Sequence, residues 1–138
     1  MPLKNIRNLL QPRRMRLLMW FLTGLTLTMA FLPQPPTTVV DQLGDKFQHM
    51  LAFAMLTSVA LLGWPQSRRL QILTLLSILG AIIELVQAIP ALHRDSDWHD
   101  WLADTLSILA AIVILDPILR VLRIESSAIS DTLREPES

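Results

Sequence analysis

The 138-residue chain contains no cysteine. This absence excludes disulfide bonds, a thiol nucleophile and thiolate metal ligands, and it leaves the redox compartment undetermined. Neither sign of charge is in excess, because 12 basic side chains balance 12 acidic ones. The sequence also lacks a phosphate-binding loop, a G-x-S-x-G elbow, a Rossmann fingerprint and an H-E-x-x-H metal motif. The common motifs of soluble enzymes are therefore missing, and the distribution of apolar and polar residues has to supply the functional signal.

Apolar residues make up 51% of the chain, and the mean hydropathy is +0.43. They do not alternate with polar residues but gather in four stretches, each close to the roughly 20 residues that cross a bilayer core. Short links with Pro33, Pro65 and Pro90 separate these stretches and favour antiparallel neighbours. The pattern predicts an all-α, polytopic membrane protein, a small antiparallel bundle of four transmembrane helices over residues 17–32, 47–64, 70–89 and 101–119.

Three regions follow from this pattern: a basic N-terminus (1–16), the transmembrane domain (17–119) and a polar, flexible tail (120–138). A cleaved signal peptide is an alternative interpretation of the N-terminus, because basic residues precede an apolar run. That run is longer than a usual signal core, and the residues from Met29 to Leu32 provide no small-x-small cleavage site. We therefore expect the first stretch to remain as a span.

The basic residues indicate the orientation. Most of them lie before the first span, between the second and third, or after the fourth, and only Lys46 and Arg94 lie at the other ends of the spans. The positive-inside rule then predicts that both termini are cytoplasmic. Because topology already explains the dispersed basic residues, the sequence does not favour nucleic-acid binding.

Polar and charged residues cluster at the ends of the spans that are predicted to face outward. A charge at the centre of a transmembrane helix costs about 2.5 to 3.5 kcal/mol on insertion scales, so such a cluster implies a shared hydrated or paired site. Helical spacing supports this, since residues four apart, such as Asp100 and Asp104, lie on one helix face. The predicted site residues are Asp45, Lys46, His49, Glu84, Gln87, Arg94, Asp100 and Asp104.

Other polar residues have simpler interpretations. Either Asp95 or Asp97 is expected to be the N-cap of the last helix. Trp98 and Trp101 are expected to anchor the outer interface, and Asp116 is expected to be exposed at the inner interface. For the site itself, an ion-pair network that only holds the helices together remains open. The carboxylates and His49 can also hold a divalent cation, but the sequence assigns neither metal ligands nor a cofactor.

The motifs D-K-x-x-H at Asp45 to His49 and E-x-x-Q at Glu84 to Gln87, followed by Arg94, Asp100 and Asp104, resemble the VanZ-like family of small integral membrane proteins. The resemblance covers about residues 41–115 and implies a bacterial inner-membrane protein. The family is named for a protein that gives low-level resistance to teicoplanin, a role that the resemblance does not carry over to this chain. Asp104 stands where many members have Asn. Ser107 stands where Gly is usual, which implies slightly wider packing between the third and fourth helices.

The expected function is binding of a polar cell-envelope ligand, either a lipid headgroup or a lipid-linked wall precursor, by a protein surrounded by membrane lipids. Lys46 and Arg94 would engage phosphate or carboxylate groups. One alternative is a membrane enzyme that uses Glu84 or Asp104 as acid or base, with a metal and His49. Another is a structural or accessory subunit without catalysis.

Overall fold

The computed structural model describes residues 11–32, 44–92 and 96–132, except for the side chains of residues 45 and 124–132. These ranges contain the α-helices α2 (Pro12–Phe31), α3 (Asp45–Gly63), α4 (Arg69–Gln87) and α5 (Trp98–Thr132) and the short 3₁₀-helix η2 (Pro90–Leu92). They contain no β-strand. The all-α prediction is confirmed for the described part of the chain.

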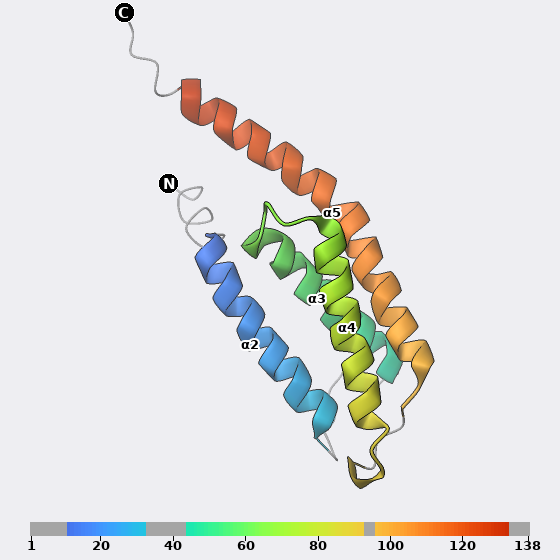
Figure 1. Cartoon of the computed structure of the whole chain (residues 1–138). Helices are drawn as coiled ribbons and strands as arrows, with labels where there is room; N and C mark the ends of the chain where they lie inside the picture. The colour runs from blue at the N-terminus through green and yellow to red at the C-terminus, as the bar shows by residue number, and fades with distance from the viewer. Residues whose placement is uncertain (1–10, 33–43, 93–95, 133–138) are drawn as a thin grey trace, which may run out of the picture.

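Consecutive α-helices run in opposite directions and form one elongated bundle (Figure 1). Helix α3 packs against α2 on one side and against α5 on the other, and α4 packs mainly against α5. The start of α2, the link between α3 and α4, and the later part of α5 lie at one end of the bundle. The end of α4, η2 and the start of α5 lie at the opposite end, and this end carries the predicted site.

Proline and glycine mark several helix boundaries. Pro12 begins α2, where its fixed φ suits the first helical turn and its missing N–H leaves no bond unmade. Gly44 precedes α3 with a φ of +90°, a left-handed backbone that other residues adopt only with strain. Pro90 follows the end of α4. The predicted link positions are therefore close to the observed ends.

Three of the four described α-helices are long and apolar enough to cross a membrane: Lys46–Gly63, Arg69–Gln87 and Trp98–Arg123. Large apolar side chains project outward from them, as in Leu75 and Leu85, which are 69% and 72% exposed. Such a surface suits lipid far better than water. Helix α2 is less apolar because it contains three arginines and three threonines, so a fourth span remains a prediction.

Helix α5 is longer than predicted, since it continues past residue 119 as far as Thr132. The first part of the region predicted as a tail is therefore helical. Pro117 lies inside this helix, where it cannot donate the backbone hydrogen bond to the carbonyl of Val113. Figure 1 shows α5 changing direction in its middle, as an internal proline favours.

The apolar core lies where α3, α4 and α5 meet. Phe53, Leu56, Leu61, Ile83 and Ile108 are at most 1% exposed. Close packing of such side chains supplies most of the attraction between helices in a membrane, where no water remains to be released. The core thereby fixes the positions from which the polar side chains project.

The expectation that Asp116 is exposed is wrong. Asp116 is only 8% exposed and pairs with Arg69 of α4 and with Arg120, whose Nη2 lies 2.8 Å from its Oδ2. The physical reason is helical spacing. Asp116 follows the buried Ile108 and Ile112 at steps of four residues, so it lies on the face of α5 that contacts the other helices.

Candidate functional site

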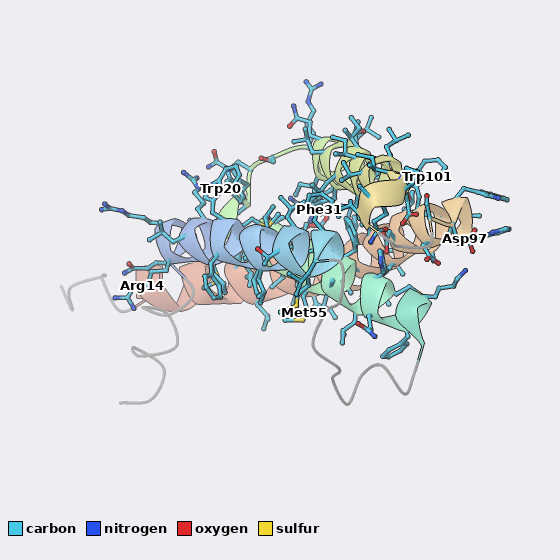
Figure 2. All side chains as sticks on the ribbon, turned by 90° about the horizontal axis from the view of Figure 1, so that it is seen from below. Arg14, Trp20, Phe31, Met55, Asp97 and Trp101 are labelled. Atoms are coloured by element: carbon cyan, nitrogen blue, oxygen red, sulfur yellow. The ribbon has the colours of Figure 1, made fainter. Side chains whose placement is uncertain are left out.

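Six polar residues, five from three helices and one from the segment just before α5, come together at the end of the bundle where α5 begins. We call this set the polar corner; it consists of Lys46, His49, Glu84, Asp97, Asp100 and Asp104. Figure 2 shows Asp97 and Trp101 on the same side of the molecule, far from Arg14 of α2. Five of the eight predicted site residues thus meet. Arg94 and the side chain of Asp45 lie outside the described residues.

Asp104 is the deepest acid of the polar corner. It is 0% exposed, and its Oδ2 lies 3.4 Å from Nδ1 of His49 on α3. Gly80 of α4 makes room for it, because a Cβ atom at position 80 would lie 3.4 Å from the same Oδ2. The small residue therefore lets α4 approach α5 closely enough to enclose the carboxylate.

Glu84 connects the end of α4 to the segment that enters α5. It is 7% exposed, and its Oε2 accepts hydrogen bonds from the backbone N–H of Asp97 at 3.1 Å and from the hydroxyl of Ser96 at 3.4 Å. The same hydroxyl is also 3.0 Å from the backbone oxygen of Glu84. These bonds fix one oxygen of the Glu84 carboxylate.

Asp97 caps α5. Its Oδ1 accepts a hydrogen bond from the backbone N–H of His99 at 3.0 Å and lies 2.5 Å from Nδ1 of the same residue. These two hydrogen bonds to His99 hold the pKa of Asp97 below its usual value. The capping prediction is confirmed for Asp97, while Asp95 lies outside the described residues.

Lys46 lies at the rim of the polar corner. Its side chain is 49% exposed, and its Nζ lies 3.1 Å from Oδ1 of Asp100 and 3.6 Å from Oδ2 of Asp97. The ion pairs connect the start of α3 to the start of α5. Because Lys46 is half exposed, its ammonium group is also accessible from outside the bundle.

Among the described residues, the polar corner leaves buried oxygens without hydrogen-bond donors. Oε1 of Glu84 and Oδ1 of Asp104 are buried and have no hydrogen-bond partner in the described part of the chain. Most buried polar atoms in proteins do have a partner, because leaving one unpaired costs about 1 to 3 kcal/mol. Two unpaired oxygens in one cluster therefore indicate a missing donor or cation.

His49, Glu84 and Asp100 form a candidate group of metal ligands. Each offers one ligand atom, and these three atoms lie within 4.8 Å of one another. The sequence left metal ligands unassigned, because no helical repeat such as H-E-x-x-H joins residues that come from three different helices.

Gln87, the remaining predicted site residue, contacts a different helix. It is 2% exposed, and its Nε2 donates a hydrogen bond of 3.1 Å to the backbone oxygen of Ala30 on α2. Gln87, the last residue of α4, therefore connects α4 to α2 and does not belong to the polar corner.

We expect Gln87→Leu to loosen α2, since it removes this buried hydrogen bond and leaves the Ala30 carbonyl without its donor. A loss of about 1 to 2 kcal/mol in unfolding free energy is expected. Thermal unfolding in detergent measures the effect. Gln87→Glu, which has the same volume but no N–H donor when ionised, should lose stability as well, and equal unfolding temperatures for wild type and Gln87→Leu would contradict the role.

The expectation that Ser107 lies between the third and fourth predicted helices is wrong. The family resemblance set it between the third and fourth predicted helices, but its hydroxyl donates a 2.6 Å hydrogen bond to the backbone oxygen of Met50 on α3. Ser77 is a polar contact between α4 and α5: its Oγ lies 2.8 Å from Thr105 Oγ1 and accepts a hydrogen bond from Nε1 of Trp101 at 3.1 Å. Ser77 lies seven residues before Glu84 and therefore on the same face of α4, which is the sequence signal for this contact.

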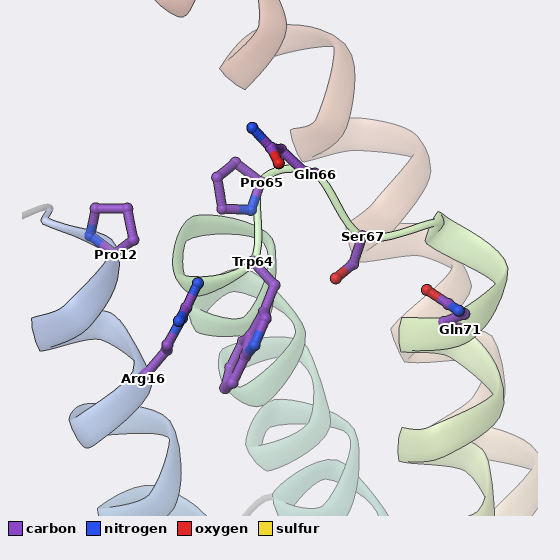
Figure 3. A pocket seen from close by; sticks show the side chains of 7 residues that line it. All are labelled: Pro12, Arg16, Trp64, Pro65, Gln66, Ser67 and Gln71. Carbon is purple, nitrogen blue, oxygen red and sulfur yellow. The ribbon is translucent and has the colours of Figure 1, made fainter.

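A hollow of about 560 Å³ lies at the opposite end, between α2 and the link from α3 to α4 (Figure 3). Arg16 faces Trp64 across it, with the guanidinium carbon 5.4 Å from the ring centroid, and Arg16 Nε donates to the backbone oxygen of Gly63 at 2.9 Å. These contacts hold α2 to the end of α3. The hollow has a single charged lining residue, so the polar corner is the stronger candidate for a functional site.

Comparisons of the chain with protein-family models, with curated proteins and with solved structures gave no match. The resemblance to the VanZ-like family stays a prediction from motifs.

Proposed function

We propose that this protein crosses the bacterial inner membrane four times, with both termini in the cytoplasm, and that its polar corner binds a polar ligand of the cell envelope. The ligand would be a lipid headgroup or the headgroup of a lipid-linked wall precursor. The distribution of Lys and Arg supports this orientation. The alternating directions of the four helices and the VanZ-like motifs are consistent with it.

The unpaired oxygens of Glu84 and Asp104 carry the proposal. An ion-pair network that served only to hold the helices would be more stable with its buried atoms satisfied, although the structural Arg69–Asp116 pair also leaves Nε of Arg69 without a hydrogen-bond partner within the described ranges. Oxygens without donors suit a ligand that provides hydroxyl, amide or ammonium groups. Headgroups of envelope lipids and sugar-linked precursors provide such donors.

Basic residues would give the corner a second kind of contact. Lys46 is half exposed at the rim, and Arg94 comes four residues before the start of α5. A phosphate or carboxylate of the ligand would bind to these cations, while its donor groups reach the acids below. The corner would therefore recognise a headgroup that has both an anionic group and hydrogen-bond donors.

The test compares Glu84→Gln and Arg94→Ala with wild type by native mass spectrometry of protein taken from bacterial membranes. Glu84→Gln keeps the shape of the side chain but replaces the unpaired acceptor. We expect both variants to fold and to retain at least tenfold less headgroup lipid, since a hydrogen bond to a charged group contributes about 1.5 to 3 kcal/mol. Glu125→Gln, the same change outside the corner, is the matched control.

Cells that carry these variants would also be compared for sensitivity to envelope-targeting antibiotics, including glycopeptides. Equal lipid retention and normal sensitivity in Glu84→Gln and Arg94→Ala, together with reduced thermal stability, would favour a purely structural role and reject the proposal.

A further inference from the structure

We propose that His49, Glu84 and Asp100 bind a divalent metal ion within the polar corner. The inference deepens the proposed function and rests on it in one respect, namely that the corner is a ligand site. The ligand atoms of these three residues lie within 4.8 Å of one another. One imidazole nitrogen and two carboxylate oxygens form a mixed ligand set, which suits Mn²⁺ or Zn²⁺.

Oε1 of Glu84 also supports a metal ion, because it is buried and has no hydrogen-bond partner among the described residues. Glu84 is 7% exposed, and its other oxygen is already held by the N–H of Asp97 and the hydroxyl of Ser96. A buried carboxylate oxygen without a donor is stabilised by a cation. The bonds to Oε2 also fix the orientation of the carboxylate, so this ligand is positioned before an ion binds.

The position of Asp104 gives His49 the chemistry of a metal ligand. Nδ1 of His49 lies 3.4 Å from Oδ2 of the fully buried Asp104. If Nδ1 carries the proton that faces this carboxylate, the lone pair of the neutral ring is on Nε2. Ligating histidines generally donate their other N–H to a carboxylate in this way, which sets the tautomer and raises ligand basicity. Asp104 is therefore a positioning residue and not a ligand.

Charge and distance are also compatible with an ion. In the described part of the chain, three buried acids, Glu84, Asp100 and Asp104, lie near Lys46 at the rim and His49, and a divalent cation would stabilise the ionised form of these acids. Lys46 contacts Oδ1 of Asp100, which leaves the second oxygen of that carboxylate for a metal. A tetrahedral ion with bonds of about 2.1 Å needs ligand atoms about 3.4 Å apart, so ligand atoms that now lie up to 4.8 Å apart have to approach by up to about 1.4 Å.

A metal ion here would also explain how an acidic corner can bind an anionic headgroup. Divalent ions held by a few carboxylates commonly complete their coordination with a phosphate of the ligand. The ion would lie between the acids and the phosphate, and Lys46 would contact the same phosphate from the rim.

The test is a titration of the full-length protein in detergent, after EDTA treatment, with Mn²⁺ followed by electron paramagnetic resonance and with Zn²⁺ in competition. We expect one ion per chain for wild type and at least tenfold weaker binding for Glu84→Gln and Asp100→Asn. Asp104→Asn should bind about 10- to 100-fold more weakly, as changes in residues that orient ligands do, while its fold is retained. Glu125→Gln should bind like wild type.

Two results would overturn the inference: no saturable binding by wild type at about 1 mM metal, the weak end of extracellular sites, or equal binding by wild type and both ligand variants. If a variant does not fold, wild type alone decides, because saturating metal should raise its unfolding temperature and EDTA should reverse the change. Absence of that shift also rejects the site. If the protein retains headgroup lipid in EDTA and binds no metal, the metal site is rejected and the proposed function is not. If it binds metal but no lipid, the proposed function is rejected and the metal site is not.

Discussion

Replacing Gly80 with leucine is expected to separate α4 from α5 and to cost about 3 kcal/mol or more of unfolding free energy, the upper range for overpacking. A Cβ atom at position 80 would lie 3.4 Å from Asp104 Oδ2, 3.4 Å from Phe53 Cζ and 3.5 Å from Trp101 Cδ1. A single methyl group fits at these distances. The rest of a leucine side chain would have to displace a buried carboxylate and two aromatic rings.

Gly24 provides the matched control. It lies in α2, and a Cβ atom there has no neighbour within 4 Å. We expect Gly24→Leu to change stability by no more than about 0.5 kcal/mol, and Gly80→Ala to remain close to wild type. Thermal unfolding in detergent, followed by circular dichroism, measures all three variants. If Gly80→Leu unfolds at the same temperature as Gly24→Leu, the close approach of α4 to α5 is wrong.

Much of the helical arrangement was predictable because bilayer thickness and helix rise fix the length of an apolar span. The ends of α3 and α4 agree closely with the predicted spans, and prolines or a glycine mark the adjacent links. The end of α5 was not predictable in this way. Its polar residues after 119 end an apolar span but do not end a helix, so the backbone continues to Thr132.

The polar corner was predictable in composition but not in its contacts. Helical spacing brings Asp100 and Asp104 to one face of α5, yet it cannot say which face of α3 or α4 lies opposite. That depends on packing, and it decides that His49 meets Asp104 while Gln87 meets Ala30 of α2. The unpaired oxygens that support a ligand arise from three-dimensional distances, and no sequence pattern contains them.

Because Asp116 is buried, its substitution is expected to lower the free energy of unfolding strongly. Asp116→Ala should destabilise the protein by about 2 to 3 kcal/mol, because it leaves the Arg69 guanidinium without its carboxylate between α4 and α5. The side chains of Asp116 and Arg69 are only 11% and 19% exposed, so water can replace the lost partner only in part. Removing one partner of a fully buried ion pair costs about 3 to 5 kcal/mol, and this partial exposure makes the expected loss smaller.

Arg120→Ala is the control variant, because it removes an exposed ion pair of the same carboxylate and leaves the buried pair with Arg69 in place. Arg120 contacts the same carboxylate at 2.8 Å, but its side chain is 64% exposed, and exposed pairs contribute at most about 1 kcal/mol. The free energy of unfolding, measured by chemical unfolding in mixed micelles, should therefore be highest for wild type, lower for Arg120→Ala and lowest for Asp116→Ala. Equal losses for the two substitutions would mean that Asp116 is solvated and that the α4–α5 contact at this end is open. The predicted order requires instead that the Arg69–Asp116 pair join the two helices from within, at the end of the bundle opposite the polar corner.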